Sequence, residues 1–142
     1  MTPEQRTLRD RLAGVPARLA RAAAGARPAA GEWSAAENVR HLIAVEDVVW
    51  HARLEQLVQE PNPHWPWIEP PPASFPGDDS LETVLARFAS RRAGTVAHLD
   101  GLDDAGWSRT GTHATYGVLD VTGLMTRAID HDEDHIASLE AG

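Results

Sequence analysis

The prolines constrain the fold of this chain more than any other residue type. Seven of the ten lie between Pro61 and Pro76, interleaved with His64, Trp65 and Trp67. Proline has no backbone N–H and clashes with the preceding turn inside a helix, so this segment predicts a long ordered loop. Apolar residues recur at helical spacing on both sides of it. We therefore expect two helices before the loop and two after it.

The first helix is expected to begin with a capping box. Thr2 and Gln5 are three residues apart, and Pro3 stands at the first helical position, where its missing N–H is not needed. The apolar pattern continues to a Gly/Pro/Ala loop at residues 25–33. Pro16 interrupts the pattern and predicts a kink, or the end of the first half of the helix.

The second helix carries another S-x-x-E capping box. Ser34 and Glu37 mark its start, and its apolar positions continue until the helix must stop near Pro61. Glu37 also shares a helix face with His41, which makes it an alternative fourth metal ligand or a support for that histidine. Capping is the usual role of a glutamate at this position, and we assign it that role.

Two further helices follow the proline-rich segment. Asp79 and Glu82 begin the third, and the last runs from about Leu119 to Leu139. A chain of 142 residues is long enough to bury one core without disulfides or metals. We therefore expect a single all-α domain over residues 1–142.

Composition and charge exclude several classes of protein. There is no cysteine, so neither a disulfide nor a thiolate metal site can form, and metal ligands must be histidines and carboxylates. The formal charge of −8 repels phosphate backbones and no basic stripe interrupts it, so no nucleic-acid partner is expected. The N-terminus lacks a hydrophobic signal core, and no apolar run approaches the roughly 20 residues needed to span a bilayer. We expect a cytoplasmic protein without a membrane partner.

The last predicted helix carries a pair of histidines that are candidate metal ligands. His131 and His135 are four residues apart, so both imidazoles project from the same helix face. They also occupy positions that the apolar pattern assigns to the core, where imidazole nitrogens need partners. Either each histidine hydrogen-bonds a buried carboxylate or hydroxyl, or the pair binds a metal ion, for which this is a ligand spacing.

A third metal ligand must come from upstream, because only seven residues follow His135. His41, near the start of the second helix, is the best candidate, since the start of one helix in an antiparallel bundle lies beside the middle or end of another. An i,i+4 pair together with a third histidine favours metal binding over isolated core histidines. We predict that His41, His131 and His135 bind one divalent ion.

The acidic residues between the paired histidines have a simpler interpretation. Asp132 stands where the H-E-x-x-H zinc-protease motif has glutamate, but it is one carbon shorter and no downstream ligand follows, so a protease is disfavoured. Asp132, Glu133 and Asp134 each point about 100° further around the helix. This spacing predicts a solvated acidic face.

The other four histidines are assigned no metal. His51, ten residues after His41, is rotated about 80° away from the metal face. His64 and His113 fall in predicted loops, and His98 lies near the end of the third helix, where the helix dipole favours a cation.

The two tryptophans of the proline-rich segment have two interpretations. Trp65 and Trp67 are expected to pack in the core, and the alternative is that they fold over a pocket.

These motifs, in this order, resemble the DinB/YfiT-like superfamily over nearly the whole chain. The resemblance rests on Trp33-Ser34-x-x-Glu37-x-x-x-His41-Leu42, the Trp107 loop and His131-Asp132-x-x-His135. It implies a four-helix bundle in which His41, His131 and His135 bind a divalent ion, typically zinc or nickel, and it implies that homodimers are common. Some relatives are thiol-dependent S-transferases or isomerases that use mycothiol, bacillithiol or glutathione, and many have no known activity.

Three interpretations of function stay open. Three neutral imidazoles leave open positions on the ion, where a small thiol can lose its proton and attack an electrophile, as in an S-transferase. The first alternative is a non-catalytic metal-binding stress-response protein, in which the ion fastens the second helix to the last. The second is a hydrolase that uses metal-bound water. An anion-binding arginine such as Arg40 or Arg109 in an open pocket favours the transferase, and a closed site favours the structural role.

Overall fold

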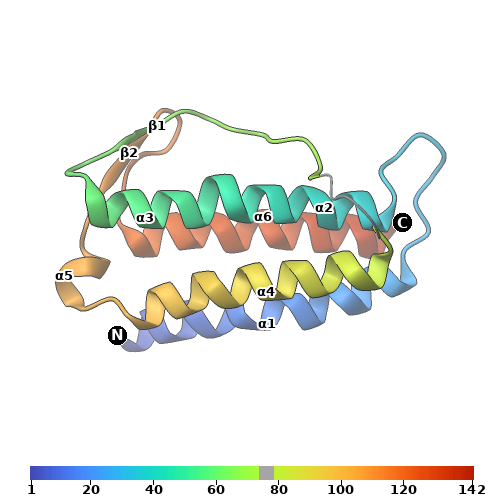
Figure 1. Cartoon of the computed structure of the whole chain (residues 1–142), viewed down its shortest axis with the longest axis horizontal. Helices are drawn as coiled ribbons and strands as arrows, with labels where there is room; N and C mark the ends of the chain where they lie inside the picture. Colours follow the sequence, from blue (N-terminus) through green and yellow to red (C-terminus); the bar gives the residue numbers. More distant parts are fainter. Residues whose placement is uncertain (74–78) are drawn as a thin grey trace.

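Four long helical segments form the body of the molecule. The computed structural model describes residues 1–73 and 79–142. The segments are α1 (Pro3–Gly25), α2 with its continuations η1 and α3 (Ala35–Val45, Glu46–His51 and Ala52–Gln59), α4 (Leu81–Asp100) and α6 (Val121–Ala141). Helix α1 contacts α4 and α6, and α2 contacts the same two helices from the other side (Figure 1). The expected four-helix bundle is confirmed, with a small sheet added at one end.

The long connection between α3 and α4 sets the directions of the helices. In Figure 1, α1 and α6 run from the end marked N toward the end marked C, while α2, α3 and α4 run the opposite way. The described part of the connection, residues 60–73, returns along the length of the bundle. Helix α2 is therefore antiparallel to α6, as the prediction of a shared histidine site requires.

Side-chain caps begin the helices close to the predicted positions. The Thr2 hydroxyl accepts the Gln5 N–H, and the Gln5 side chain accepts the Thr2 N–H. Ser34 and Glu37 form the same reciprocal pair, so the capping role of Glu37 is confirmed. Ser80 caps α4, between the two residues predicted to begin it.

Pro16 lies inside α1, which is continuous over Pro3–Gly25. The predicted end of the helix at this proline was therefore wrong, and the alternative, a kink, stays a prediction. Proline removes the N–H that would bond the Leu12 carbonyl four residues earlier. The Arg92 side chain supplies the missing donor, because its Nη1 donates to the Leu12 carbonyl oxygen at 3.0 Å. Helix α1 therefore tolerates an internal proline because α4 satisfies the freed carbonyl.

A π-helical turn interrupts the second predicted helix. It forms η1, Glu46–His51, and α-helical geometry resumes at Ala52. Such a turn adds a residue to the helical register and is frequent at functional sites. Here Trp50, on the turn, and Arg53, just after it, both line the main cavity.

A small sheet covers one end of the bundle and was not predicted. The parallel pair is β1 (His64–Trp65) with β2 (Gly111–His113), and β2 pairs antiparallel with β3 (Gly117–Leu119). The loops predicted around His64 and His113 thus contain short strands, and a short helix, α5 (Asp104–Trp107), precedes β2. Strands of two or three residues are too short to leave a periodic pattern in the sequence.

The proline-rich segment is non-helical as far as the structure describes it, through Ala73. Trp65 is buried in the core, as predicted, whereas Trp67 is 57% exposed and lines the cavity instead. The predicted loop continues to Pro76, which lies outside the described residues.

A buried ionic network crosses the centre of the bundle. Arg92 of α4 donates to both carboxylate oxygens of Glu46 at 2.9 Å and to Asp132 Oδ2 at 2.8 Å. The three side chains are each 1% exposed. Asp132 is therefore not on a solvated face, and that prediction was wrong for this residue. A helical periodicity cannot reveal that an arginine on another helix supplies a buried partner.

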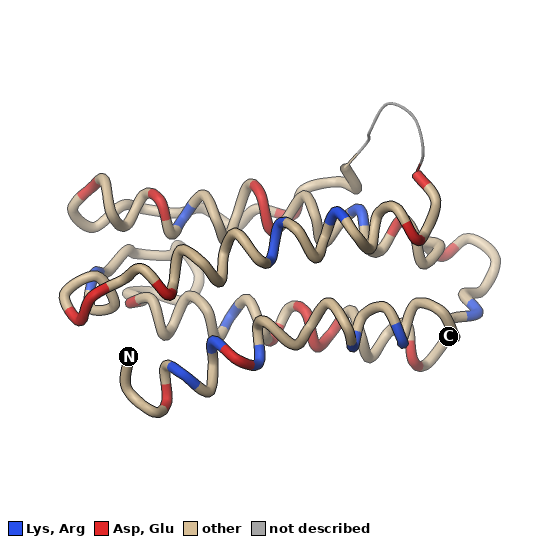
Figure 2. Tube along the Cα trace, turned by 60° about the horizontal axis from the view of Figure 1, so that its bottom comes forward, with Lys and Arg blue, Asp and Glu red and all other residues tan. Residues whose placement is uncertain are grey.

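The remaining charged residues lie mostly on the surface. Figure 2 shows acidic and basic residues interspersed along the helices, without a continuous basic stripe. Within residues 1–73 and 79–142, no helix is both long enough and apolar enough to cross a membrane.

Candidate metal centre

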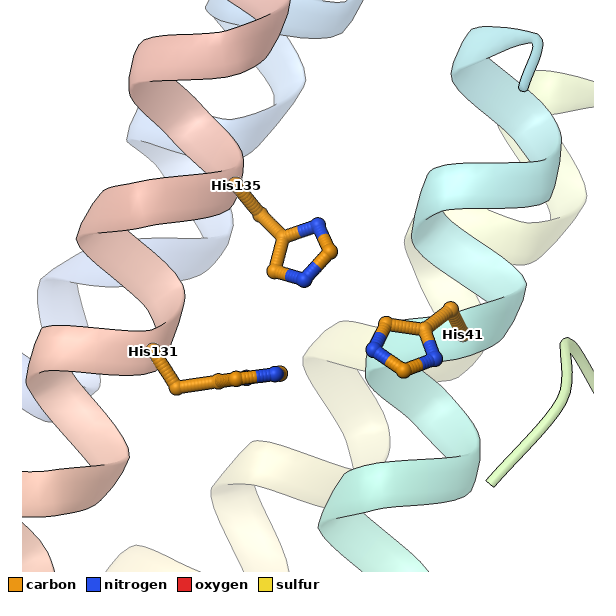
Figure 3. A group of neighbouring side chains, drawn as sticks. All are labelled: His41, His131 and His135. Atoms are coloured by element: carbon orange, nitrogen blue, oxygen red, sulfur yellow. The ribbon is translucent and has the colours of Figure 1, made fainter. Parts of the chain in front are cut away.

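The structure brings the three predicted histidines together. One nitrogen from each of His41, His131 and His135 lies within 4.8 Å of the corresponding nitrogens of the other two. Their ring centroids are 4.7 to 5.5 Å apart. Figure 3 shows His131 and His135 projecting from successive turns of α6 toward His41, which projects from α2 on the facing side. The i,i+4 spacing and the antiparallel helices together produce this convergence.

Hydrogen bonds orient two of the three imidazoles. His41 Nδ1 donates to the Pro70 carbonyl oxygen at 2.9 Å, and His135 Nδ1 lies 3.2 Å from Asn38 Oδ1, to which it donates. The Asn38 amide is itself fixed, because its Nδ2 donates to the Ser34 carbonyl. With the proton held on Nδ1, Nε2 of each ring carries the lone pair that a metal ion needs.

Two nitrogens of the histidine cluster lack a hydrogen-bond partner. His41 Nε2 and His131 Nδ1 are buried and make no hydrogen bond with any described residue. His41 is 0% exposed, and the other two histidines are partly buried. Buried imidazole nitrogens normally find a partner, so a divalent ion fits this donor set.

Burial keeps two of the histidines neutral. It lowers the pKa of His131 and of His135 to about 4, with a further lowering from the neighbouring histidines. A metal ligand must be the neutral imidazole. At neutral pH both side chains are therefore in the form that binds an ion.

A carboxylate that the sequence did not single out lies beside the three histidines. Glu69 Oε1 is 3.2 Å from His41 Nε2, and the Glu69 side chain is 53% exposed. It belongs to the proline-rich connection, where no periodic pattern places a side chain relative to the helices. Loop residues of this kind become visible as site residues only once the chain is folded.

A cavity of about 460 Å³ adjoins the histidines. His131 lies in its wall, together with Glu69 and with aromatic residues from three parts of the chain. These are Trp50 of η1, Trp67 of the proline-rich connection and Tyr116 of the turn between β2 and β3. The cavity thus combines an apolar wall, polar groups and the candidate metal ligands, which is the usual composition of a small-molecule site.

Two other arginines take the place predicted for Arg40 and Arg109. Arg40 lies 3.4 Å from the Ala73 carbonyl oxygen and Arg109 donates to the Leu57 carbonyl, and neither lines the cavity. The cavity contains Arg53 and Arg127 instead. Helical spacing alone does not identify them, because their place in the wall depends on the sheet that closes the cavity.

The histidines outside the predicted site are distributed as follows. His51 lies 3.0 Å from Glu55, away from the three clustered histidines. His98 was expected to be a cation, but burial lowers its pKa and favours the neutral ring. His64 is exposed, and His113 is buried in the cavity wall rather than in a surface loop.

The comparisons with known proteins agree with the bundle fold. The solved structure of YfiT from Bacillus subtilis, described as a probable metal-dependent hydrolase with an unusual four-helix bundle topology, matches at a TM-score of 0.73 and 19% identity. The match covers 98% of this chain and 86% of that chain, and at this identity it shows the fold alone. No curated protein matches the chain. The family model of the DinB superfamily matches residues 5–139, and the chain belongs to this superfamily.

Proposed function

We propose that this protein is a divalent-metal-dependent enzyme that activates a nucleophile supplied from outside the chain. The observation that carries the proposal is the convergence of three imidazoles, within 4.8 Å, in a site that adjoins a cavity of about 460 Å³. Three histidines suit zinc or nickel and leave coordination positions open to a reactant. A bound ion with three neutral ligands keeps its full charge and lowers the pKa of a coordinated thiol or water toward neutrality.

Within this class, we propose a thiol S-transferase. The chain has no cysteine, so the sulfur arrives with a small thiol of the bacillithiol, mycothiol or glutathione type. The thiol loses its proton, the sulfur forms a bond to the electrophilic carbon, and the leaving group departs with its electron pair. The aromatic wall of Trp50, Trp67 and Tyr116 suits the apolar part of the electrophile.

Glu69 is the residue best placed to take the proton. Its carboxylate lies 3.2 Å from His41 Nε2. A nucleophile held among the three imidazoles is therefore within reach of a carboxylate base. Asn38 and the Pro70 carbonyl hold two of the imidazoles in place while this happens.

Two other functions use the same geometry. A metal-dependent hydrolase is favoured by Glu69, because the same carboxylate can take a proton from water. YfiT, which shares the fold, is described as a probable metal-dependent hydrolase. A non-catalytic role follows if Glu69 serves as a fourth ligand and closes the site. The ion then fastens α2 to α6 in a metal-binding stress-response protein.

The test offers metal-loaded and chelated protein a haloarene such as chlorodinitrobenzene, or an epoxide, with each of the three thiols and without thiol. We expect metal-dependent conjugation with one thiol, a loss of about 10²–10⁴ in kcat for Glu69→Gln, and an unchanged rate for His51→Ala. Metal-dependent hydrolysis without thiol assigns the hydrolase. Inactivity of protein that holds a full complement of metal supports the structural role, and turnover that survives complete chelation contradicts both metal mechanisms.

A further inference from the structure

Arg53 is a buried cation that the proposed chemistry leaves without a role. It is 4% exposed, and its Nη2 donates to the Pro66 carbonyl oxygen at 2.7 Å. Among the described residues it has no carboxylate partner, in contrast to Arg92, and burial lowers its pKa. Buried arginines are rarely left without an anion. Because Arg53 also lines the cavity, its guanidinium is available to bind an anionic ligand there.

His113 adds a neutral donor to the same wall. It is 4% exposed, and its Nδ1 accepts the backbone N–H of Thr115 at 2.9 Å and that of Tyr116 at 3.3 Å. Because Nδ1 accepts, the proton of the neutral ring is on Nε2. Burial, together with the nearby charges of Arg53 and Arg127, lowers the pKa of His113 and keeps the ring neutral. Nε2–H has no hydrogen-bond partner among the described residues and is available to a ligand in the cavity.

Arg127 is a third donor in the cavity wall, and it connects Arg53 and His113 to the candidate metal ligands. Its guanidinium lies 3.9 Å from the centre of the Tyr116 ring, and that ring is 4.7 Å from His113. Arg127 and His131 are four residues apart on α6, which is one turn or about 6 Å along the axis. An anionic group held near Arg127 is therefore about one helical turn from His131, the nearer of the two clustered histidines on α6.

The acidic residues that line the cavity do not neutralise Arg53 or Arg127. Glu133 is already bound by Arg18, whose two terminal nitrogens lie 2.6 and 2.7 Å from its carboxylate oxygens. Asp130 and Asp134 are exposed, and Glu69 is beside His41. Solvated carboxylates screen a buried cation far less than a direct partner does.

We propose that the cationic wall, formed by the cations Arg53 and Arg127 and the neutral donor His113, binds the carboxylate of a small reactant whose reactive atom lies at the three histidines. The proposal rests on the proposed function and narrows it to a carboxylate-bearing substrate or thiol with an apolar or aromatic body. The two oxygens of a carboxylate match the planar fork of a guanidinium. The His113 Nε2–H supplies a further donor, and Trp67 and Tyr116, whose rings are 6.3 Å apart, flank the body of the molecule.

The test measures binding without turnover. Phenylacetate and its neutral analogue phenylacetamide are titrated calorimetrically into zinc-loaded and metal-free protein. We expect phenylacetate to bind at least about tenfold more tightly than the amide in both forms of the protein. The reason is that a hydrogen bond to a charged group stabilises a complex more than a hydrogen bond to a neutral group does. Arg53→Gln should remove this preference. Arg91→Gln, an exposed arginine on α4 outside the cavity, should keep it.

Several results would overturn the proposal. Equal affinities for the two compounds, or no binding of phenylacetate, refute it whether or not Arg53→Gln folds. If the preference for phenylacetate disappears when zinc is removed, the metal ion binds the carboxylate. If the preference survives in folded Arg53→Gln, residues other than Arg53 bind it. Either result contradicts the cationic wall. A protein that selects the carboxylate but catalyses nothing contradicts the proposed function alone, and an active protein without that selectivity contradicts the cationic wall alone.

Discussion

Replacing Arg92 with methionine tests the ionic network that joins four helical segments. Arg92 of α4 contacts Glu46 of η1, Asp132 of α6 and the Leu12 carbonyl of α1 at distances of 2.8 to 3.0 Å. Methionine fills similar space but leaves both carboxylates buried without a cation. We expect Arg92→Met to be strongly destabilising while the helices keep their positions.

The magnitude follows from the burial of the network. Removing one partner of a buried ion pair costs about 3–5 kcal/mol, because the other charge is left uncompensated. The unsatisfied Leu12 carbonyl, which has no helical donor because of Pro16, adds roughly 1 kcal/mol. Together these losses lower the free energy of unfolding by roughly 4–6 kcal/mol, a large share of the ~5–15 kcal/mol that stabilises a typical domain.

Two control variants should lose much less stability than Arg92→Met. Arg91→Met, one residue earlier on α4, removes an exposed pair with Asp47 and should cost no more than about 1 kcal/mol. Asp132→Asn should also lose only about 1 kcal/mol. The network holds two carboxylates for one arginine, and burial raises the pKa of Asp132 to about 7 despite that partner. A neutral amide of the same shape therefore resembles a form that the side chain already adopts near neutral pH.

The assay is urea unfolding near neutral pH, followed by far-UV circular dichroism for the wild type and the three variants. The expected order of destabilisation is Arg92→Met far above Asp132→Asn and Arg91→Met. If Arg92→Met loses no more free energy of unfolding than Arg91→Met, the network does not stabilise the fold as described.

Two further predictions concern pH and packing. Metal-free protein should lose stability as the pH falls from about 6.5 toward 4: His131 and His135, with folded pKa values lowered to about 4, bind fewer protons folded than unfolded in this window. Urea midpoints measured across this range should show the loss, and saturating zinc should raise the midpoint at each pH. Gly111→Ala should lower the free energy of unfolding by about 1–3 kcal/mol, because its Cβ would overlap the Trp65 ring. Gly94 lies in a helix with open space around it, so Gly94→Ala should be neutral or stabilising in the same unfolding assay.

The sequence predicts the helices because their signals are local. Caps such as Thr2 and Ser34, the apolar periodicity and the proline-rich segment each act within a few residues, and the helices begin close to the predicted positions. The three histidines come together for a related reason. The i,i+4 spacing fixes His131 against His135, and antiparallel packing brings His41 to them.

The features that the sequence did not predict depend on contacts between distant segments. Asp132 is buried because Arg92 reaches it from another helix, and Pro16 is tolerated for the same reason. Arg53 and Glu69 reach the cavity through a π turn and a proline-rich connection, neither of which has a periodic signal. The expected homodimer and the expected lack of nucleic-acid binding stay predictions, because both concern a second molecule.

Metal content is the most direct test of the central claim that the three histidines hold one divalent ion. Protein purified without chelators is analysed by inductively coupled plasma mass spectrometry, for the wild type and for alanine variants of His41, His131, His135 and, as a control, His51. The account predicts one ion per chain in the wild type and in His51→Ala, and a loss of stoichiometric metal in each of the other three. Metal retained in full by all three variants would contradict it.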